Sequence, residues 1–231
     1  MNKTIKDIED IDRIYVEYYT DPLCCWSWAF ELHWRRFVNE NASLIQWRYR
    51  MCGLLPDWNN YTDPLYEVSR PGQMGPLWLQ AKRATGIYND ERIWDYDPPA
   101  SSYPACIAMK CVEKQSSLAC DLYLQFLRQA VMLHRKNIAK RSVLLMIATQ
   151  LERSYPQIFD AMLFEKDLDE NNGVSAFRED LLKTKFHNLT RFPAITMKKQ
   201  GLKGIILVGY RPYEAFMEAF LQLMGATAKQ S

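Results

Sequence analysis

The residues best suited to chemistry are a pair of adjacent cysteines in the segment Asp21–Trp28, which reads DPLCCWSW. A strand-like run, Ile14–Tyr19, precedes this segment, and apolar residues at helical spacing follow it. Cys24 therefore lies where a strand passes into a helix, and the unpaired N–H groups and the dipole of a helix start favour an anion. We expect the Cys24 thiol to lose its proton readily and to act as a nucleophile.

The cysteine content predicts free thiols and no metal site. Six cysteines among 231 residues are not a disulfide scaffold, and most are expected to be buried as small apolar side chains. The chain has three histidines and no Cys-x-x-Cys pair, so structural zinc is not expected. The cysteines are Cys24, Cys25, Cys52, Cys106, Cys111 and Cys120.

Composition and charge favour a globular protein. Hydrophobic residues make up 48% of the chain and charged residues 24%, an ordinary balance for one large domain or one domain with an insertion. The net charge of +2 is spread among mixed signs, so neither nucleic acid nor a membrane is expected as a partner. Residues 1–12 lack the apolar stretch of a signal peptide, and no apolar run approaches the length of a membrane span. We expect a cytoplasmic protein.

Hydrophobic periodicity and turn residues predict the elements that position Cys24. Strands are expected over residues 14–19, 45–51, 193–197 and 204–208, and helices over residues 23–39, 78–84, 103–114, 118–134, 141–152, 156–166, 175–185 and 212–225. Proline, glycine and asparagine predict loops over residues 53–76 and 95–101.

The element order is β-α-β, then a helical block, then β-β-α. The simplest packing joins both ends of the chain in one four-stranded sheet. We therefore predict an α/β fold whose first part spans residues 1–62. A helical insertion then spans residues 63–188, and residues 189–231 complete the first domain.

This layout resembles the thioredoxin-like fold with a large all-helical insertion that is typical of the DsbA-like family. Asp21–Trp28 is similar to the active-site segment of its cytoplasmic FrnE-like branch, which reads roughly D-P-x-C-P-W-C-(Y/W). Phe192-Pro193 stands in the place of the family's cis-proline, and Asp97–Pro99 with Ser101–Cys106 resembles the insertion of that branch. Kappa-class glutathione transferases and 2-hydroxychromene-2-carboxylate isomerases, which carry S-P-x-S at this position, are also similar.

The chain departs from the family's redox motif at the second thiol, where Ser27 stands. A dithiol enzyme forms a mixed disulfide that its second thiolate resolves, and a hydroxyl cannot do so. Ser27 is either a hydrogen-bond donor to the Cys24 thiolate or a polar residue of the helix start. Cys25 is a poor resolving thiol because a disulfide between neighbours is strained, and it is otherwise a packing residue. Cys106, near the start of an insertion helix, is the other candidate resolving thiol, with burial as the alternative.

The resemblance also implies a substrate-binding set beside Cys24, made of Phe192, Pro193, Trp26 and Arg191. If the bond before Pro193 is cis, the backbone of Phe192 is free to pair with an extended peptide or with glutathione. Arg191 suits a carboxylate of such a substrate, and a solvated arginine is the alternative.

Three functions are compatible with these residues. The first is a DsbA-like thiol–disulfide oxidoreductase, in which the single nucleophile Cys24 attacks a protein disulfide or a glutathione disulfide. The second is a kappa-type glutathione transferase or isomerase that acts on a small electrophile. The third is a non-catalytic thioredoxin-like adaptor that delivers a client to a protease. No cofactor is required, glutathione is a candidate co-substrate, and a homodimer is left open.

Overall fold

The computed structural model describes residues 13–63 and 67–225. The expectations for residues 1–12, and the part of the predicted loop at 64–66, lie outside the described residues. Within these ranges no helix is both long enough and apolar enough to cross a lipid bilayer. The elements are β1 (Ile14–Thr20), α2 (Cys25–Ala29), α3 (Glu31–Glu40), β2 (Ile45–Met51), η1 (Pro71–Gln73), α4 (Met74–Thr85), α5 (Ile93–Tyr96), α6 (Tyr103–Gln115), α7 (Ser117–Met132), α8 (Arg141–Ser154), α9 (Ala161–Asp169), α10 (Val174–Phe186), β3 (Ala194–Lys198), β4 (Ile205–Val208) and α11 (Tyr213–Gly225).

Both ends of the chain contribute to one four-stranded sheet with the strand order β2-β1-β3-β4. β1 runs parallel to β2, with Ile14 opposite Ile45, and antiparallel to β3, with Tyr19 opposite Ala194. β4 completes the sheet antiparallel to β3. The predicted thioredoxin-like α/β fold with a helical insertion is confirmed.

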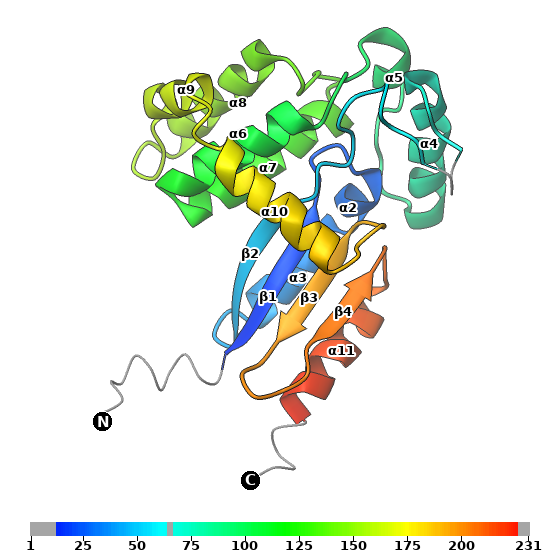
Figure 1. Cartoon of the computed structure of the whole chain (residues 1–231), viewed down its shortest axis with the longest axis vertical. Helices are drawn as coiled ribbons and strands as arrows, with labels where there is room; N and C mark the ends of the chain where they lie inside the picture. Colours follow the sequence, from blue (N-terminus) through cyan, green and yellow to red (C-terminus); the bar gives the residue numbers. More distant parts are fainter. Residues whose placement is uncertain (1–12, 64–66, 226–231) are drawn as a thin grey trace.

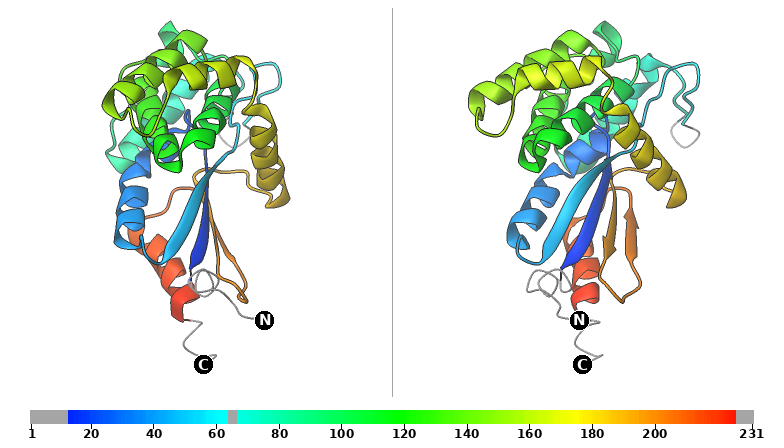
Figure 2. Two further views of the ribbon diagram at one scale, coloured as in Figure 1. Left: turned by 90° about the vertical axis from the view of Figure 1, so that its left-hand side faces the viewer. Right: turned by 60° about the vertical axis from the view of Figure 1, so that its left-hand side comes forward.

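Helices cover the two faces of the sheet differently. α3 and α11 lie against one face, and α10 crosses the other (Figures 1 and 2). Aromatic side chains join α3 to α11, because the ring centroid of Phe37 lies 4.4 Å from that of Phe216 and 5.1 Å from that of Phe220. Apolar residues three and four positions apart place Phe37 on the buried face of α3 and both Phe216 and Phe220 on the buried face of α11, as the sequence pattern predicts.

Helices α4 to α10 lie between β2 and β3 in the chain, and buried charges tie them to the sheet. The carboxylate of Asp180 in α10 is fully buried and accepts hydrogen bonds from Arg50 at 2.9 Å and from the Met51 N–H at 3.0 Å. Lys110 of α6 lies 3.0 Å from the same carboxylate. These partners satisfy a charge that would otherwise be expensive to bury. The domain boundaries at residues 63 and 188 stay a prediction.

The helix predicted over residues 23–39 is wrong, because the chain forms two helices that meet at Phe30. The Phe30 N–H bonds to the carbonyls of both Trp26 and Trp28, so the first helix ends in a tight turn. The five-residue α2 therefore carries the cysteine segment by itself, and α3 supplies the apolar face.

Two further helix boundaries differ from the prediction. The helix expected over residues 156–166 begins at Ala161 instead, because the carboxylate of Asp160 caps the N–H of Leu163 at 2.9 Å. The helix expected from residue 175 begins at Val174, and its cap residue is Gly173. The loop expected over residues 95–101 overlaps the short helix α5.

Candidate functional site

Cys24 is the N-cap residue of α2, with an extended backbone at φ −77° and ψ 107°. Its sulfur accepts a hydrogen bond from the N–H of Ser27 at 3.4 Å and donates one to the carbonyl of Phe192 at 3.7 Å. The bond between Phe192 and Pro193 is cis, as the resemblance implies. The structure therefore brings together Cys24, Ser27, Phe192 and Pro193 from the two ends of the chain.

The expectation that Cys24 loses its proton readily is wrong, because the thiol is only 5% exposed. Burial raises the pKa of Cys24, since a thiolate there loses its hydration. The hydrogen bond from the Ser27 N–H and the nearby Ser27 hydroxyl lower the pKa, and the charge of Asp21 raises it again. The Ser27 hydroxyl oxygen is buried and has no hydrogen-bond partner among the described residues.

Asp21 is a buried carboxyl that the sequence reasoning missed as a site residue. It is fully buried and accepts hydrogen bonds from the N–H groups of Leu23 at 2.8 Å and Leu54 at 2.7 Å. The hydroxyl of Ser102 donates to it at 2.7 Å. Burial raises the pKa of Asp21, and these hydrogen bonds act against that change. Its position between a buried strand and Cys24 was the available signal in the sequence.

Cys106, one of the two candidate resolving thiols, is hydrogen-bonded to Asp21. Its thiol is fully buried and donates to the Asp21 carboxylate at 3.4 Å. Burial, together with the charge of Asp21, raises the pKa of Cys106 well above its usual value. A thiol held in this way is a weak nucleophile toward a mixed disulfide on Cys24.

The other cysteines are also free and buried, as predicted. Cys25 is 3% exposed within the main core, and burial raises its pKa well above the usual value. Cys52, which the sequence reasoning did not single out, follows β2 and donates its N–H to the carbonyl of Thr20 at 2.9 Å. Burial raises its pKa most, and the charges of Asp21, Cys106 and Cys24 add to that effect.

The remaining predicted substrate residues, Trp26 near Cys24 in the chain and Arg191 next to Phe192, offer little to a substrate. Trp26 is half-buried, its ring lies 6.0 Å from that of Tyr210, and its indole N–H has no partner among the described residues. Arg191 is exposed, and no ion pair or hydrogen bond joins it to another described side chain. The second interpretation of Arg191, a solvated side chain, is the one that its environment matches.

Arg128 of α7 is a buried charge next to the site that sequence reasoning missed. Its side chain is fully buried, donates to the Thr20 hydroxyl at 2.5 Å and pairs with Glu31. Its guanidinium lies 5.9 Å from the centre of the Tyr18 ring. Its positive charge lowers the pKa of Cys24, but by less than burial raises it. An arginine on the inward, apolar face of a predicted helix was the signal.

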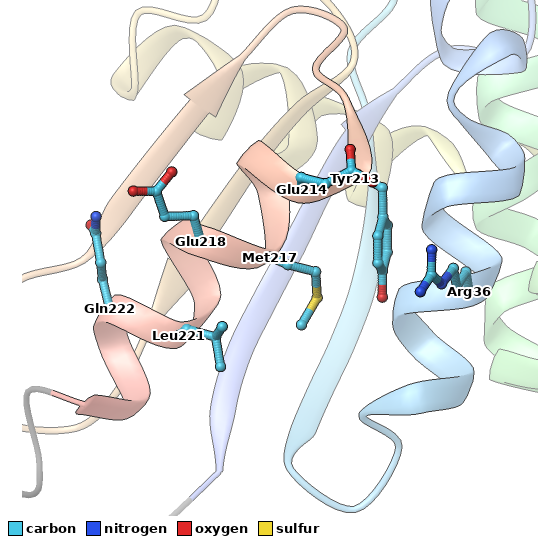
Figure 3. Close-up of a pocket in the computed structure, with 7 residues that line it drawn as sticks. All are labelled: Arg36, Tyr213, Glu214, Met217, Glu218, Leu221 and Gln222. Carbon is cyan, nitrogen blue, oxygen red and sulfur yellow. The ribbon is translucent and has the colours of Figure 1, made fainter.

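Two surface pockets lie away from Cys24. One of about 620 Å³ lies along α11, where Met217 and Leu221 are flanked by Glu214 and Glu218 (Figure 3). Another of about 840 Å³ lies on the sheet. Neither is lined by Cys24. In the part of the chain that the structure describes, no three His, Cys, Asp or Glu side chains gather as metal ligands would.

The fold and the cysteine segment beside a cis-proline define a DsbA-like member of the thioredoxin superfamily. The chain belongs to the thioredoxin family Thioredoxin_5, whose model matches residues 18–218.

Two curated relatives are similar along most of this chain. It is 26% identical over 214 residues to the ClpXP adapter protein SpxH of Halalkalibacterium halodurans, an alignment that covers 91% of this chain and 68% of the relative. It is 24% identical over 217 residues to SpxH of Bacillus subtilis, which covers 92% of this chain and 68% of the relative.

Solved structures with the same fold are redox proteins or an isomerase. A protein of Nitrosomonas europaea, provisionally assigned as a protein disulfide isomerase, matches with a TM-score of 0.77 and 16% identity over 93% of this chain and 98% of that one. The cytosolic disulfide reductase DsbM of Pseudomonas aeruginosa matches with a TM-score of 0.67 and 19% identity over 90% and 99%. A 2-hydroxychromene-2-carboxylate isomerase matches with a TM-score of 0.63 and 15% identity over 94% and 99%. At these identities the likeness shows the fold alone.

Proposed function

We propose that this chain is a non-catalytic adapter, which binds a client protein and delivers it to a protease of the ClpXP type. The observation that carries this proposal is the closed state of Cys24. The thiol is buried, this burial raises its pKa, and the S–H group donates a hydrogen bond to the Phe192 carbonyl. Thiol–disulfide exchange instead needs an accessible thiolate.

The lack of a second reactive thiol supports the same proposal. Ser27 occupies the position from which a dithiol enzyme resolves its mixed disulfide, and its hydroxyl cannot perform that step. Cys106 is hydrogen-bonded to Asp21, and Cys25 is packed in the core. The two SpxH relatives, which match about nine-tenths of this chain, are themselves ClpXP adapters.

The test separates delivery of a client from chemistry at Cys24. In cells that lack this chain, protein half-lives are measured across the proteome by pulse labelling. We expect at least one protein to become longer-lived, and both the wild-type chain and a Cys24→Ser variant to restore its turnover. In a second strain that lacks active ClpXP, the same protein should also have a longer half-life. Deleting the gene for this chain in that strain should cause no further change. Rescue by wild type but not by Cys24→Ser would contradict the adapter proposal.

A monothiol exchange reaction at Cys24 is the second candidate, and the cis bond before Pro193 is the observation that favours it. The Phe192 carbonyl lies 3.7 Å from the Cys24 sulfur, in the position where a thioredoxin-fold enzyme aligns a substrate. The similar DsbM was also solved with GSH. In this candidate, glutathione is the co-substrate and the cytoplasm is the location, as for the cytosolic DsbM.

Intact mass after exposure to oxidised glutathione tests this candidate. A single glutathione adduct that disappears in Cys24→Ser would favour monothiol exchange. Retention of reduced glutathione by both wild type and Cys24→Ser would favour the kappa-type transferase instead. An unmodified protein that retains no glutathione is the result that the adapter proposal expects.

A further inference from the structure

A pocket of about 840 Å³ opens on the sheet face that α10 crosses, at the end of the sheet away from Cys24. Its floor comes from all four strands, including Tyr15 of β1, Thr196 of β3 and Ile206 of β4. The register places Tyr15 opposite Lys198 at the far end of β1, five residues before Thr20 and the cysteine segment. Figure 1 shows that α10 covers the upper half of this face and leaves the lower half without a helix.

The wall of this pocket carries unusually exposed apolar side chains. Phe186, the last residue of α10, lines the pocket and is 80% exposed. Ile206 of β4, on the floor, is 44% exposed. The Phe186 ring contacts that of His187, with 5.1 Å between their centroids. Large apolar side chains that gather around a concavity mark an interaction site more often than isolated ones do.

The charges around the pocket favour an anionic occupant. Lys183 and Lys198 line it, and neither forms an ion pair with another described residue. The acids are already neutralised, because Glu17 lies 2.5 Å from Arg50, and Glu113 pairs with both Arg48 and Lys110. Asp180, which also faces Arg50 and Lys110, is fully buried behind them. Among these described residues five cations therefore accompany three carboxylates. Lys183 and Lys198 form no ion pair with these residues and are exposed, and the charge of Lys183 also helps to lower the pKa of Glu17.

We propose that this pocket binds an acidic segment of a partner protein that carries one aromatic or aliphatic anchor residue. The anchor packs against Phe186 and Ile206, and the flanking carboxylates pair with Lys183 and Lys198. Neighbouring strands lie about 4.8 Å apart, so the floor from β2 to β4 spans about 14 Å, the length of four or five extended residues. A surface of that width suits a peptide strand better than a compact small molecule.

This surface goes beyond the adapter proposal and does not depend on it. The pocket lies at the end of the sheet opposite Cys24, and its binding is measured without a protease. If the turnover experiment fails but the peptide still binds, only the adapter proposal is wrong. If the peptide does not bind but the turnover experiment succeeds, only the proposal for this pocket is wrong.

Fluorescence anisotropy with the full chain tests this proposal. The probe is a fluorescein-labelled peptide of about ten residues with one central Phe among Asp and Glu, long enough to cross the floor. We expect Phe186→Ser to weaken binding about ten-fold or more, because the anchor loses an apolar contact. Lys183→Glu and Lys198→Glu should each weaken it several-fold, with less effect at high salt.

Matched controls lie on surfaces away from the pocket. Leu221→Ser alters an apolar side chain of α11 that is 59% exposed, and Lys136→Glu alters an exposed lysine after α7. Both should leave the affinity unchanged. Peptides with Lys in place of the acids, or Ser in place of Phe, should bind at least ten-fold more weakly. Equal binding by wild type and Phe186→Ser, or no binding by wild type, would overturn the proposal.

Other occupants give distinct results. If sedimentation equilibrium shows a wild-type dimer that Phe186→Ser converts to monomer, the occupant is a second copy and the proposal fails. If a synthetic peptide of residues 1–12 displaces the probe more tightly than unlabelled probe does, the occupant is the chain's own segment. Tighter displacement by a single-stranded oligonucleotide would make the site a nucleic-acid surface, which also overturns the proposal.

Discussion

Arg128→Met tests whether a buried charge holds the insertion on the sheet. Arg128 lies on α7 of the insertion, and its partners Thr20 and Glu31 lie on β1 and α3. Methionine keeps much of the apolar length of the side chain and removes the charge and its hydrogen bonds. The substitution therefore separates the ionic contribution from simple packing.

The expected loss of folding stability depends on which interactions the partners of Arg128 keep after the substitution. Removing one member of a buried ion pair costs about 3–5 kcal/mol when the other charge stays buried and unpaired. Glu31 keeps Arg35 at 2.7 Å, and the Arg128 Nε has no partner among the described residues to lose. Both features favour the low end, about 3 kcal/mol. For a chain of this size that loss lowers the melting temperature by about 6–12 °C.

Urea unfolding followed by tryptophan fluorescence measures this loss. Arg141→Met is the control, since Arg141 forms ion pairs with Glu165 and Asp169 but is exposed to solvent. The control should change stability little, because exposed ion pairs contribute little. A second variant, Arg128→Met with Glu31→Gln, should recover part of the loss. Equal midpoints for Arg128→Met and Arg141→Met would refute the reasoning.

Three further predictions concern the thiol and one glycine. Because burial raises the pKa of Cys24, its alkylation by iodoacetamide should be slow at neutral pH and still accelerate as the pH rises above about 9; a rate that is already constant below pH 7 would contradict this. Ser27→Cys should still leave the protein unmodified by oxidised glutathione at neutral pH, because position 27 is fully buried beside the buried Cys24 and neither thiol is accessible for exchange; rapid loss of two hydrogens in the intact mass would contradict this reasoning. Gly173→Ala should destabilise the fold by about 1–3 kcal/mol in urea unfolding, because the added methyl would clash with the carbonyl of Ile107. Gly72→Ala is its control, with open space around the added atom, and equal stabilities would contradict the clash.

The fold was predictable because the spacing of apolar residues within each strand and helix indicates which of its faces is buried. Periods of two and of about four residues marked the strands and the packed helix faces, and these periods do not depend on distant contacts. Helix ends were less predictable. The break at Phe30 comes from a tight turn inside a continuous apolar pattern, and the late start at Ala161 comes from a cap at Asp160.

For the candidate site, the sequence predicted which residues come together but not the protonation or exposure of the thiol. The spacing of Cys24 and Ser27 and the resemblance at Phe192-Pro193 named groups that the fold does bring together. The state of the thiol was not predictable, because burial of Cys24 depends on tertiary packing that the local sequence does not encode. Arg128 reaches Thr20 across 108 positions of the chain, a pairing that no local pattern reveals.

Buried polar contacts a few residues before Cys24 join the insertion helices to β1 and the turn that follows it. Asp21, at the end of β1, accepts hydrogen bonds from Ser102 and Cys106 at the start of α6, and Arg128 of α7 donates to Thr20 one residue earlier. A protein that binds through its surfaces gains from the same contacts, because they fix the geometry of the sheet and its helices.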